Sequence, residues 1–259
     1  MPYKILSENI GEKMLVLLEE FGQIIILGGQ TLTGIFKGRI NRKLVIEQMV
    51  RIGVESLPLA LITAAFVGMV FALQIASEFV RFGAGKYVGG VMGIAMAREL
   101  GPAITGIVLA ARVAAAIAAE IGTMNVTDQI DALKALGGSP VRYLVIPRFL
   151  ATTLMLPLLT VLTVITGFMG GYLVAISIGK INPVQYINTA QNLASVWDLI
   201  GGLIKTAVFG MIIAIIACYR GMHTRGGAKG VGEATTSAVV TTLISLFVVN
   251  YFLSVLFFK

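Results

Sequence analysis

Three charged residues interrupt a long apolar segment of this chain, and their types and spacing make them the first candidates for chemistry. Arg98, Glu99 and Arg112 lie between Tyr87 and Ala119, in a run built mostly from Ala, Gly, Val, Ile, Leu and Met. An ionised side chain at the centre of a bilayer costs about 2.5 to 3.5 kcal/mol on insertion scales, so such residues usually face a bundle interior or a wet cavity. We therefore predict that all three side chains are sheltered from lipid.

A helix break is expected beside the first two of these residues. Pro102 has no amide to bond the carbonyl of Arg98, and Gly101 precedes it, so the helix is predicted to kink there. Backbone groups freed by such a kink are tolerated at membrane depth only where they face protein or water. The kink and the charges together predict a sheltered polar site within the membrane.

The residues alone leave two roles open for this polar site. It could lie on the path of a substrate, or it could be a structural ion pair in which Glu99 meets Arg112 of a neighbouring helix. Lys205 stands about two turns inside another apolar run. Its ammonium is predicted to extend towards the membrane surface, because long cationic side chains near helix ends do so.

The sequence contains none of the motifs that would indicate a catalytic centre. It lacks the phosphate-binding G-x-x-x-x-G-K-[ST], the zinc-binding H-E-x-x-H and the nucleophile motif G-x-S-x-G. His223 is the single histidine and lies in a basic, glycine-rich stretch, and Cys218 is the single cysteine. We predict no metal site, no cofactor and no enzymatic activity, so any ATP that the protein needs would be hydrolysed by a separate chain.

Composition identifies the elements that must position these charges. Of 259 residues, 57% are hydrophobic and 13% charged, and the mean hydropathy is +0.90, whereas soluble domains carry about 25% charged residues. About 20 consecutive apolar residues cross a hydrocarbon core as a helix. Five stretches meet this length, and the predicted fold is therefore an all-α membrane protein. The predicted spans are residues 56–77, 87–119, 149–179, 199–219 and 235–258.

The first 53 residues differ from the remainder, residues 54–259, which we take as the transmembrane domain. Ile10, Met14, Leu17, Phe21 and Ile24 recur at helical spacing with acidic and basic residues between them, which predicts an amphipathic helix lying on the membrane surface. A basic juxtamembrane stretch follows.

The distribution of Lys and Arg predicts the orientation of the chain. With five spans, thirteen of these residues fall on the side of the N-terminus and four on the other. Because cytoplasmic loops are enriched in Lys and Arg, we predict a cytosolic N-terminus and an outward C-terminus. The positive charge is spread among loops, so nucleic-acid binding is not predicted.

The longest polar segment, residues 120–148, joins the second and third spans on the predicted cytosolic side. It contains an apolar stripe, polar residues beside that stripe, and a glycine that should end the helix. Amphipathicity alone leaves a simple linker and a docking element for a cytosolic partner equally open. The candidate coupling residues are Glu120, Val126, Asp128, Ile130, Asp131, Leu133, Lys134, Leu136 and Gly137.

Small residues repeat every four positions in several spans and predict close helix contacts. Examples are Gly85, Gly89 and Gly93 in the second span, and Gly167 and Gly171 in the third. Five spans form a small bundle in which to enclose a transport path, so a homodimer is the simplest inference.

Four segments together resemble the MlaE family, the permeases of ABC transporters that work with MCE-domain proteins. They are RELGP at 98–102, AARVAAAIAAEIGTM at 110–124, DALKALGGSPVRYLVIPR at 131–148 and GVGEATTSAVV at 230–240. The resemblance extends over nearly the whole chain. It implies a homodimer in a bacterial-type inner membrane, bound to cytosolic ABC ATPase subunits and to a periplasmic MCE assembly, with the C-terminus periplasmic and residues 120–148 holding the coupling helix.

The resemblance also implies a phospholipid or related lipid as substrate. A lipid needs sheltered polarity beside apolar walls, so the substrate-path candidates are Arg98, Glu99, Leu100, Pro102, Ile104 and Arg112. The main alternative is a secondary transporter or channel that works without an ATPase. Such transporters often show two matched halves with paired broken helices, and no internal repeat is evident in this sequence.

Overall fold

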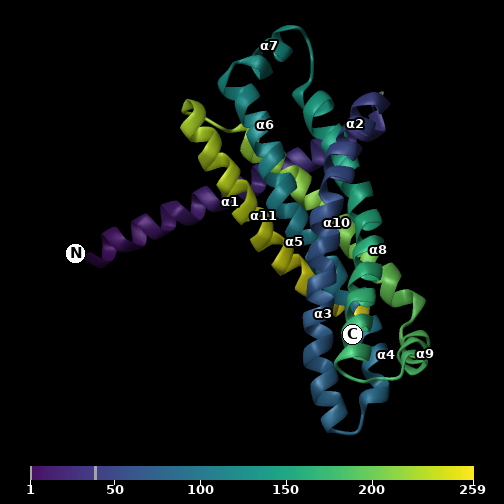
Figure 1. Ribbon diagram of the computed structural model, residues 1–259. Helices are drawn as coiled ribbons and strands as arrows, with labels where there is room; N and C mark the ends of the chain where they lie inside the picture. The colour runs from purple at the N-terminus through teal and green to yellow at the C-terminus, as the bar shows by residue number, and fades with distance from the viewer. Residues whose placement is uncertain (1, 38–39) are drawn as a thin grey trace.

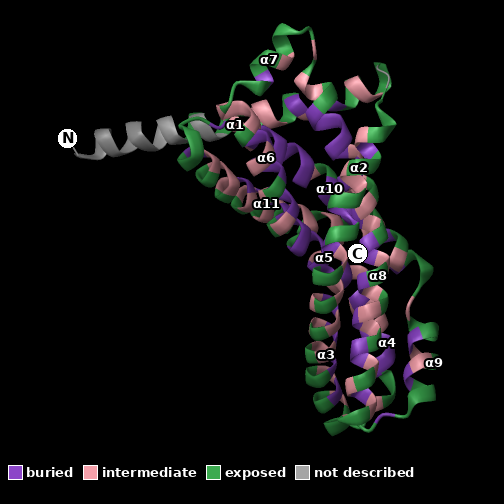
Figure 2. Cartoon of the chain, turned by 45° about the horizontal axis from the view of Figure 1, so that its top comes forward, coloured by how far each residue is buried: buried purple, intermediate pink, exposed green. Residues whose placement is uncertain are grey.

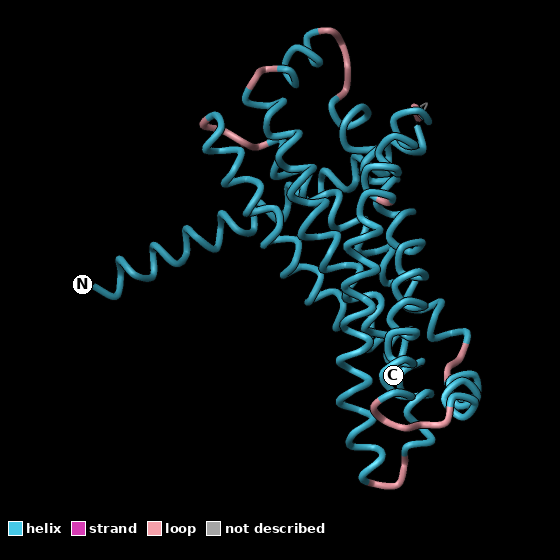
Figure 3. Tube along the Cα trace, viewed as in Figure 1, coloured by secondary structure: helices cyan, strands magenta, loops and turns pink. Residues whose placement is uncertain are grey.

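The computed structural model describes residues 2–37 and 40–259, and in the first helix it describes side chains from residue 14 onwards except those of residues 16 and 17. The described residues form helices and connecting loops without a strand (Figure 3). The predicted all-α fold is therefore confirmed. Part of the predicted N-terminal stripe, the side chains of Ile10 and Leu17, lies outside the described residues.

The helices follow one another with short connections, and Figure 1 shows their arrangement. The α-helices are α1 (Pro2–Lys37), α2 (Arg42–Ile52), α3 (Leu57–Arg81), α4 (Val88–Ala95), α5 (Gly101–Leu109), α6 (Ala115–Val126), α7 (Gln129–Ala135), α8 (Ile146–Ser177), α9 (Pro183–Leu193), α10 (Val196–Met222) and α11 (Gly227–Phe258). Short 3₁₀ turns cover Val54–Ser56 and Gly85–Tyr87, and π-helical turns cover Met96–Leu100, Ala110–Ala114 and Val141–Val145.

Five continuous helical stretches are long and apolar enough to cross a membrane, which confirms the predicted number of spans. They are Arg42–Arg81, Gly85–Val126, Val141–Ser177, Val196–Met222 and Gly227–Phe258. With a rise of about 1.5 Å per residue, each exceeds the hydrocarbon thickness of about 30 Å. The proposed boundary between residues 53 and 54 stays a prediction. One end of the bundle carries α7 and the other carries α9 (Figure 1); these are called the α7 end and the α9 end below.

The helices of the bundle approach closely through small residues. Along α3, Ala60, Ala64, Gly68, Ala72 and Ala76 are buried, and this face packs on α8. A Cβ added to Gly68 would lie 2.0 Å from the carbonyl oxygen of Gly167, and one added to Gly89 would lie equally close to that of Tyr186 in α9. The glycine spacing read from the sequence thus corresponds to real helix contacts.

The second span contains two π-helical turns, and each holds charged residues that the sequence singled out. The amide of Gly101 bonds the carbonyl of Met96, five residues earlier, so the predicted kink takes the form of a π turn that widens the helix around Arg98 and Glu99. Arg112 lies in the second π turn. Single π turns inside α-helices are frequent at functional sites.

Hydrogen bonds at the two ends of α10 fix the start of this helix and hold α1 against the bundle. Ser195 and Asp198 form a reciprocal capping box at the start of α10. At the α7 end, Arg220 of α10 forms two hydrogen bonds to the carboxylate of Glu20, and the hydroxyl of Tyr219 donates to Gln23. The second half of α1 is thereby fixed across the bundle, while its first half extends away from it (Figure 1).

Candidate functional site

Four charged side chains come together where the second span meets α10, about one third of the span's length from the α9 end. This group, the deep ion cluster, consists of Arg98, Glu99, Asp198 and Lys205. Its two ion pairs join residues about a hundred positions apart in the sequence, Arg98 with Asp198 at 2.7 Å and Lys205 with Glu99 at 3.0 Å.

Lys205 is the centre of the deep ion cluster. Its side chain is fully buried, and its ammonium donates to the carboxylate of Glu99, to the hydroxyl of Ser254 at 2.9 Å and to the carbonyl of Arg98 at 3.0 Å. The prediction that Lys205 extends to the membrane surface is therefore wrong. Its side chain lies on the face of α10 that includes buried Gly202 and Phe209, so it points into the bundle.

Pro102 explains why the ammonium of Lys205 bonds the carbonyl of Arg98. Because Pro102 has no amide hydrogen, the carbonyl of Arg98 lacks its usual helical donor, and the ammonium of Lys205 supplies a replacement. Gly202 allows this approach: a Cβ there would lie 2.2 Å from the carbonyl oxygen of Ala97 and 3.1 Å from the ring of Pro102. The freed carbonyl and the cation stabilise each other inside the bundle.

The other pair is anchored by the start of α10. One oxygen of the Asp198 carboxylate accepts from Nε of Arg98, and the other accepts from the amide of Ser195. The ring of Phe258 lies 5.0 Å from the guanidinium of Arg98 and 5.5 Å from the ammonium of Lys205, a distance typical of cation–π contacts. The end of α11 thus covers both cations.

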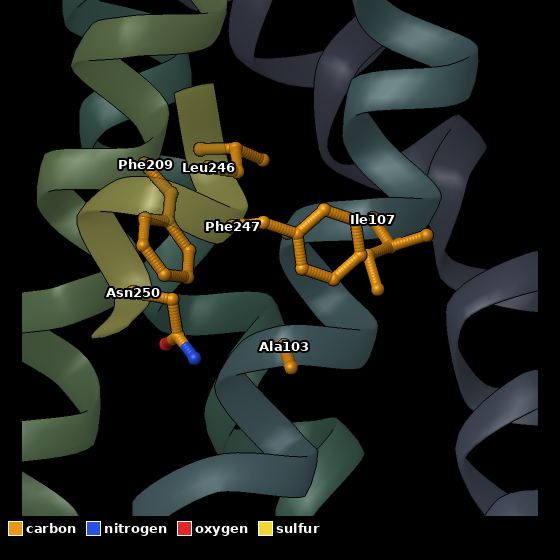
Figure 4. Close-up of a pocket in the computed structure, with 7 residues that line it drawn as sticks. Ala103, Ile107, Phe209, Leu246, Phe247 and Asn250 are labelled. Atoms are coloured by element: carbon orange, nitrogen blue, oxygen red, sulfur yellow. The ribbon is translucent and has the colours of Figure 1, made fainter. Parts of the chain in front are cut away.

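An apolar pocket adjoins the deep ion cluster on the side of α5 and α11. It encloses about 30 Å³ and is bounded by side chains of α5, α10 and α11, among them Ile107, Phe209 and Phe247 (Figure 4). Asn250 is its polar member. Its amide nitrogen donates to Glu99 at 3.3 Å, while its amide oxygen is buried without a hydrogen-bond partner among the described residues. A polar group beside an apolar wall is suited to an amphiphile.

The substrate-path candidates divide between different environments. Arg98, Glu99 and Leu100 are half-buried near the deep ion cluster, whereas Pro102 and Ile104 are buried in the core. The side chains that face the pocket from α5 are instead those of Ala103 and Ile107. Neither residue was predicted from the sequence, because both are ordinary apolar residues; Ala103 directly follows Pro102, and Ile107 lies three positions after Ile104.

Arg112 does not meet Glu99, so that part of the structural alternative is wrong. Its guanidinium donates to the carboxylate of Glu55 at 2.8 Å, to the hydroxyl of Ser56 at 2.6 Å and to the carbonyl of Arg51 at 3.2 Å. Thirteen residues separate Arg112 from Glu99, which corresponds to about 20 Å along a helix. Arg112 therefore belongs to a second cluster at the α7 end.

This second group, the rim ion cluster, links the second span to α2, α3 and α8. Its members are Arg51, Glu55, Arg112, Glu120 and Arg148. The carboxylate of Glu120 bridges Arg51 at 3.2 Å and the buried Arg148 at 2.9 Å. Glu120, predicted to couple to an ATPase, thus already has two partners within the chain.

The predicted coupling stripe is only partly free. Val126 ends α6 and is half-buried, Ile130 is buried, and Leu133 packs against the backbone of Gly138. Leu136 is 87% exposed. Asp128, between α6 and α7, has a φ of 57°, which marks a sharp turn in the chain.

The polar side of α7 is solvent-accessible. Asp131 and Lys134 form an exposed ion pair with each other at 2.9 Å. Gly137 has a φ of 77°, and its amide and that of Gly138 bond the carbonyls of Lys134 and Leu133. This arrangement confirms the predicted glycine stop of the helix.

Three members of the site that were not predicted carry recognisable signals in the sequence. Asp198 follows Ser195 at the spacing of a capping box, and Asn250 and Ser254 are polar residues one helical turn apart in an apolar span. Among the described residues no cluster of His, Cys, Asp and Glu could hold a metal ion.

Comparison with known proteins gives a consistent result. The profile of the family described as "Permease MlaE" matches residues 45–256. A Synechocystis protein named "Probable ABC transporter permease protein" is 52% identical over 90% of this chain and 89% of its own length. A Rickettsia bellii protein with the same name is 41% identical over 98% of both chains.

A plant relative is also similar. The Arabidopsis thaliana protein "TRIGALACTOSYLDIACYLGLYCEROL 1, chloroplastic" is 42% identical over 90% of this chain and 67% of its own length. With five membrane-spanning helices, the family profile over most of the chain and these relatives, the protein is a multi-pass membrane protein that belongs to the MlaE permease family of ABC transporters.

Proposed function

We propose that this permease moves a phospholipid or related diacyl lipid between a bacterial-type inner membrane and a periplasmic MCE-type carrier, driven by a separate cytosolic ABC ATPase. The observation that carries the proposal is the deep ion cluster beside an apolar pocket. A lipid combines a charged headgroup with apolar chains, and this juxtaposition suits both parts. The name of the Arabidopsis relative contains that of a diacyl glycolipid, which supports a lipid substrate.

The headgroup is assigned to Glu99, Arg98 and Asn250, and the chains to the wall that includes Ile107 and Phe247. The side chains of Glu99 and Arg98 are 42% and 35% exposed, and Glu99 is linked to the pocket through its hydrogen bond from Asn250. Lys205 is a positioning residue, because it is fully buried and holds the Glu99 carboxylate in place.

A second copy of the chain is proposed to close the site. Only 11% of the residues in the most apolar stretch of α11 are buried, whereas 28% to 61% are buried in the corresponding stretches of the other spans. The outer face of α11 is exposed (Figure 2). Glu99, which accepts a hydrogen bond from Asn250 of α11, is 42% exposed at membrane depth. Because a charge facing lipid is costly, a homodimer that places α11 and α5 at the interface would shelter it.

Transport assays can test whether lipid transfer requires the charge of Glu99. The permease and its ATPase are reconstituted in vesicles with a fluorescent phospholipid, and ATP-dependent lipid transfer is measured for the wild type, Glu99→Gln and Glu78→Gln. Glu78, exposed near the end of α3, is the matched control. We expect transfer to fall about tenfold or more in Glu99→Gln and to be unchanged in Glu78→Gln. Equal transfer by both variants would exclude Glu99 from the path.

The same vesicles test the main alternative. A secondary transporter or channel would move lipid without the ATPase, whereas the proposal requires transfer to stop when the ATPase or ATP is omitted. Transfer at the full rate by the permease alone would overturn the ABC mechanism.

The ATPase is proposed to dock on the exposed end of α7. Leu136, the most exposed apolar residue of the stripe, can fill a groove on a partner. Leu136→Asp should release the ATPase during purification and leave the melting temperature unchanged, because the side chain has no packing to lose. Leu193→Asp, an exposed apolar residue of α9 at the opposite end, is the control and should retain the ATPase.

The proposed orientation places the α7 end in the cytosol and the C-terminus in the periplasm. Single cysteines at positions 134 and 259 should react with a membrane-impermeant reagent from opposite sides of the membrane. The native Cys218 is buried, so it should not obscure the labelling. Labelling of both positions from one side would contradict the five-span topology.

A further inference from the structure

Two adjoining cavities at the α7 end have not been assigned to the transport path, and one of them borders the loop that carries Leu136. One, of about 330 Å³, lies between the end of α1 and the start of the third span, and the other, of about 410 Å³, lies between that start and the loop at residues 136–139. Ser139 and Arg142 line both of them. The two cavities therefore adjoin at Ser139 and Arg142, and together they are called the recess below.

A small residue lets α1 reach this recess. A Cβ on Gly34 would lie 2.8 Å from Cδ1 of Ile146, so α1 crosses the start of the third span in close contact. Lys37 follows one turn later and lines the same cavity as Arg142. Lys37 and Arg142, from segments about a hundred residues apart in the sequence, therefore line the same cavity.

The charges of the recess are not balanced within the described part of the chain. No Asp or Glu lines either cavity, and neither Arg142 nor Lys37 forms an ion pair with another described residue. By contrast, Arg51, Arg112 and Arg148 each have a carboxylate partner. The recess thus has the electrostatics of an anion site, and the hydroxyl of Ser139 adds a further donor.

The surface of α1 beside the recess indicates where the anion comes from. Leu32 and Phe36 are 48% and 87% exposed, whereas Leu27 and Thr31 are buried against the bundle. An amphipathic helix with exposed apolar residues inserts that face among acyl chains and holds its cations at headgroup level. Lys37 directly follows Phe36, which places its ammonium at the edge of this exposed apolar face.

We propose that Arg142 and Lys37 bind the phosphate of an anionic phospholipid from the leaflet on which α1 lies, with acyl chains beside Leu32 and Phe36. The guanidinium of Arg142 would hold two phosphate oxygens and the ammonium of Lys37 a third. This lipid is a resident partner rather than the transported one, because the recess is separated from the deep ion cluster by most of the length of the second span. It would fix α1 to the third span next to the loop that follows α7.

Binding can be measured without transport. Wild-type permease in neutral detergent micelles is titrated with phosphatidylglycerol or with phosphatidylcholine, and retained lipid is counted by native mass spectrometry. The wild type should retain phosphatidylglycerol preferentially, and Arg142→Gln and Lys37→Gln should each weaken its retention about tenfold. Lys86→Gln, an exposed cation at the α9 end, should leave it unchanged. Arg142→Lys, which keeps the charge but loses the planar fork, should fall between the wild type and Arg142→Gln.

Three results would overturn the proposal. Equal retention of the two lipids by the wild type would show that the recess does not select for charge. Displacement of phosphatidylglycerol by millimolar inorganic phosphate would show that the recess takes a free anion. If Arg142→Gln keeps the lipid but loses the ATPase on purification, the occupant is an acidic surface of that partner.

Discussion

The two ion clusters of the second span use the same residue types, but their surroundings differ. In the deep ion cluster, Lys205 is fully buried and Asp198 is 2% exposed, while their partners Glu99 and Arg98 are 42% and 35% exposed at membrane depth. In the rim ion cluster, Glu55, Arg51 and Glu120 are 40% to 54% exposed, and only Arg148 is buried. A solvent-exposed pair contributes about 0 to 1 kcal/mol, whereas breaking a buried pair costs about 3 to 5 kcal/mol. The deep cluster should therefore govern both stability and lipid passage, and the rim cluster mainly helix alignment.

The largest effect is expected for Glu99→Gln. It leaves the buried ammonium of Lys205 without a counter-charge, so we expect a loss of about 3 kcal/mol in the free energy of unfolding, measured as a fall in melting temperature in detergent. Lys205→Met in the same background removes the stranded charge and should restore most of the loss.

The double variant also separates packing from transport. If the cluster only packs helices, Glu99→Gln with Lys205→Met recovers lipid transfer together with stability. Under the proposed function stability recovers and transfer does not, because the headgroup partner is still missing. The pair to test is Glu99 with Lys205 rather than Glu99 with its sequence neighbour Arg98, since Arg98 is bound to Asp198.

The next effect comes from the close contact that brings α10 to the second span. In Gly202→Ala the new methyl group would meet the carbonyl oxygen of Ala97, so α10 must shift and Lys205 must move from the Arg98 carbonyl. We expect a loss of about 2 kcal/mol and lower lipid transfer. Gly29→Ala in α1, where a Cβ meets nothing within 4 Å, should instead be neutral or stabilising by up to about 1 kcal/mol. If Gly202→Ala changed neither stability nor lipid transfer, α10 and the second span would not be in tight contact at this position.

Sequence alone was sufficient for the spans because the bilayer imposes a length that runs of apolar residues reveal directly. It also located Arg98, Glu99 and the Pro102 break, since a charge or a proline in an apolar run is a local anomaly. The partners of these residues were not predictable in the same way. Asp198 and Lys205 lie about a hundred residues from them, and the pairing depends on how α10 packs.

The error at Lys205 has a specific physical cause. Distance from the end of an apolar run suggested that the side chain could reach the surface, but the helical face decides where it points. Asp198, Gly202, Lys205 and Phe209 recur at three- and four-residue intervals and are all buried. Reading the face instead of the distance would have placed Lys205 inside the bundle and beside Asp198.

A moderate effect is expected at the buried end of the rim ion cluster. Glu120→Gln removes the partner of Arg148, whose Nη1 retains the carbonyl of Leu144. That remaining bond and the position of Glu120 at the α7 end, where its exposed half can be hydrated, limit the loss to about 1 to 2 kcal/mol, measured by melting temperature. ATPase binding should persist, because the carboxylate of Glu120 already binds Arg51 and Arg148 of the same chain. Loss of the ATPase without loss of stability would assign Glu120 a coupling role after all.

The smallest effect, at Glu55, completes the comparison between the two clusters. Arg112 bonds Glu55 at 2.8 Å, which is as short as the pairs of the deep ion cluster, so distance alone would predict equal importance. Burial predicts otherwise, because Arg112 and Glu55 are 32% and 54% exposed, and Arg112 keeps the hydroxyl of Ser56 and the carbonyl of Arg51 when the carboxylate is removed. Glu55→Gln should therefore lower the free energy of unfolding by less than about 1 kcal/mol. Raising the salt concentration should shrink even that difference, since exposed pairs are screened, while the deficit of Glu99→Gln should persist in the same buffer. Should Glu55→Gln destabilise the protein as much as Glu99→Gln, the rim would have to be shielded from water in the assembled transporter, and the distinction between the two clusters would hold only for the isolated chain.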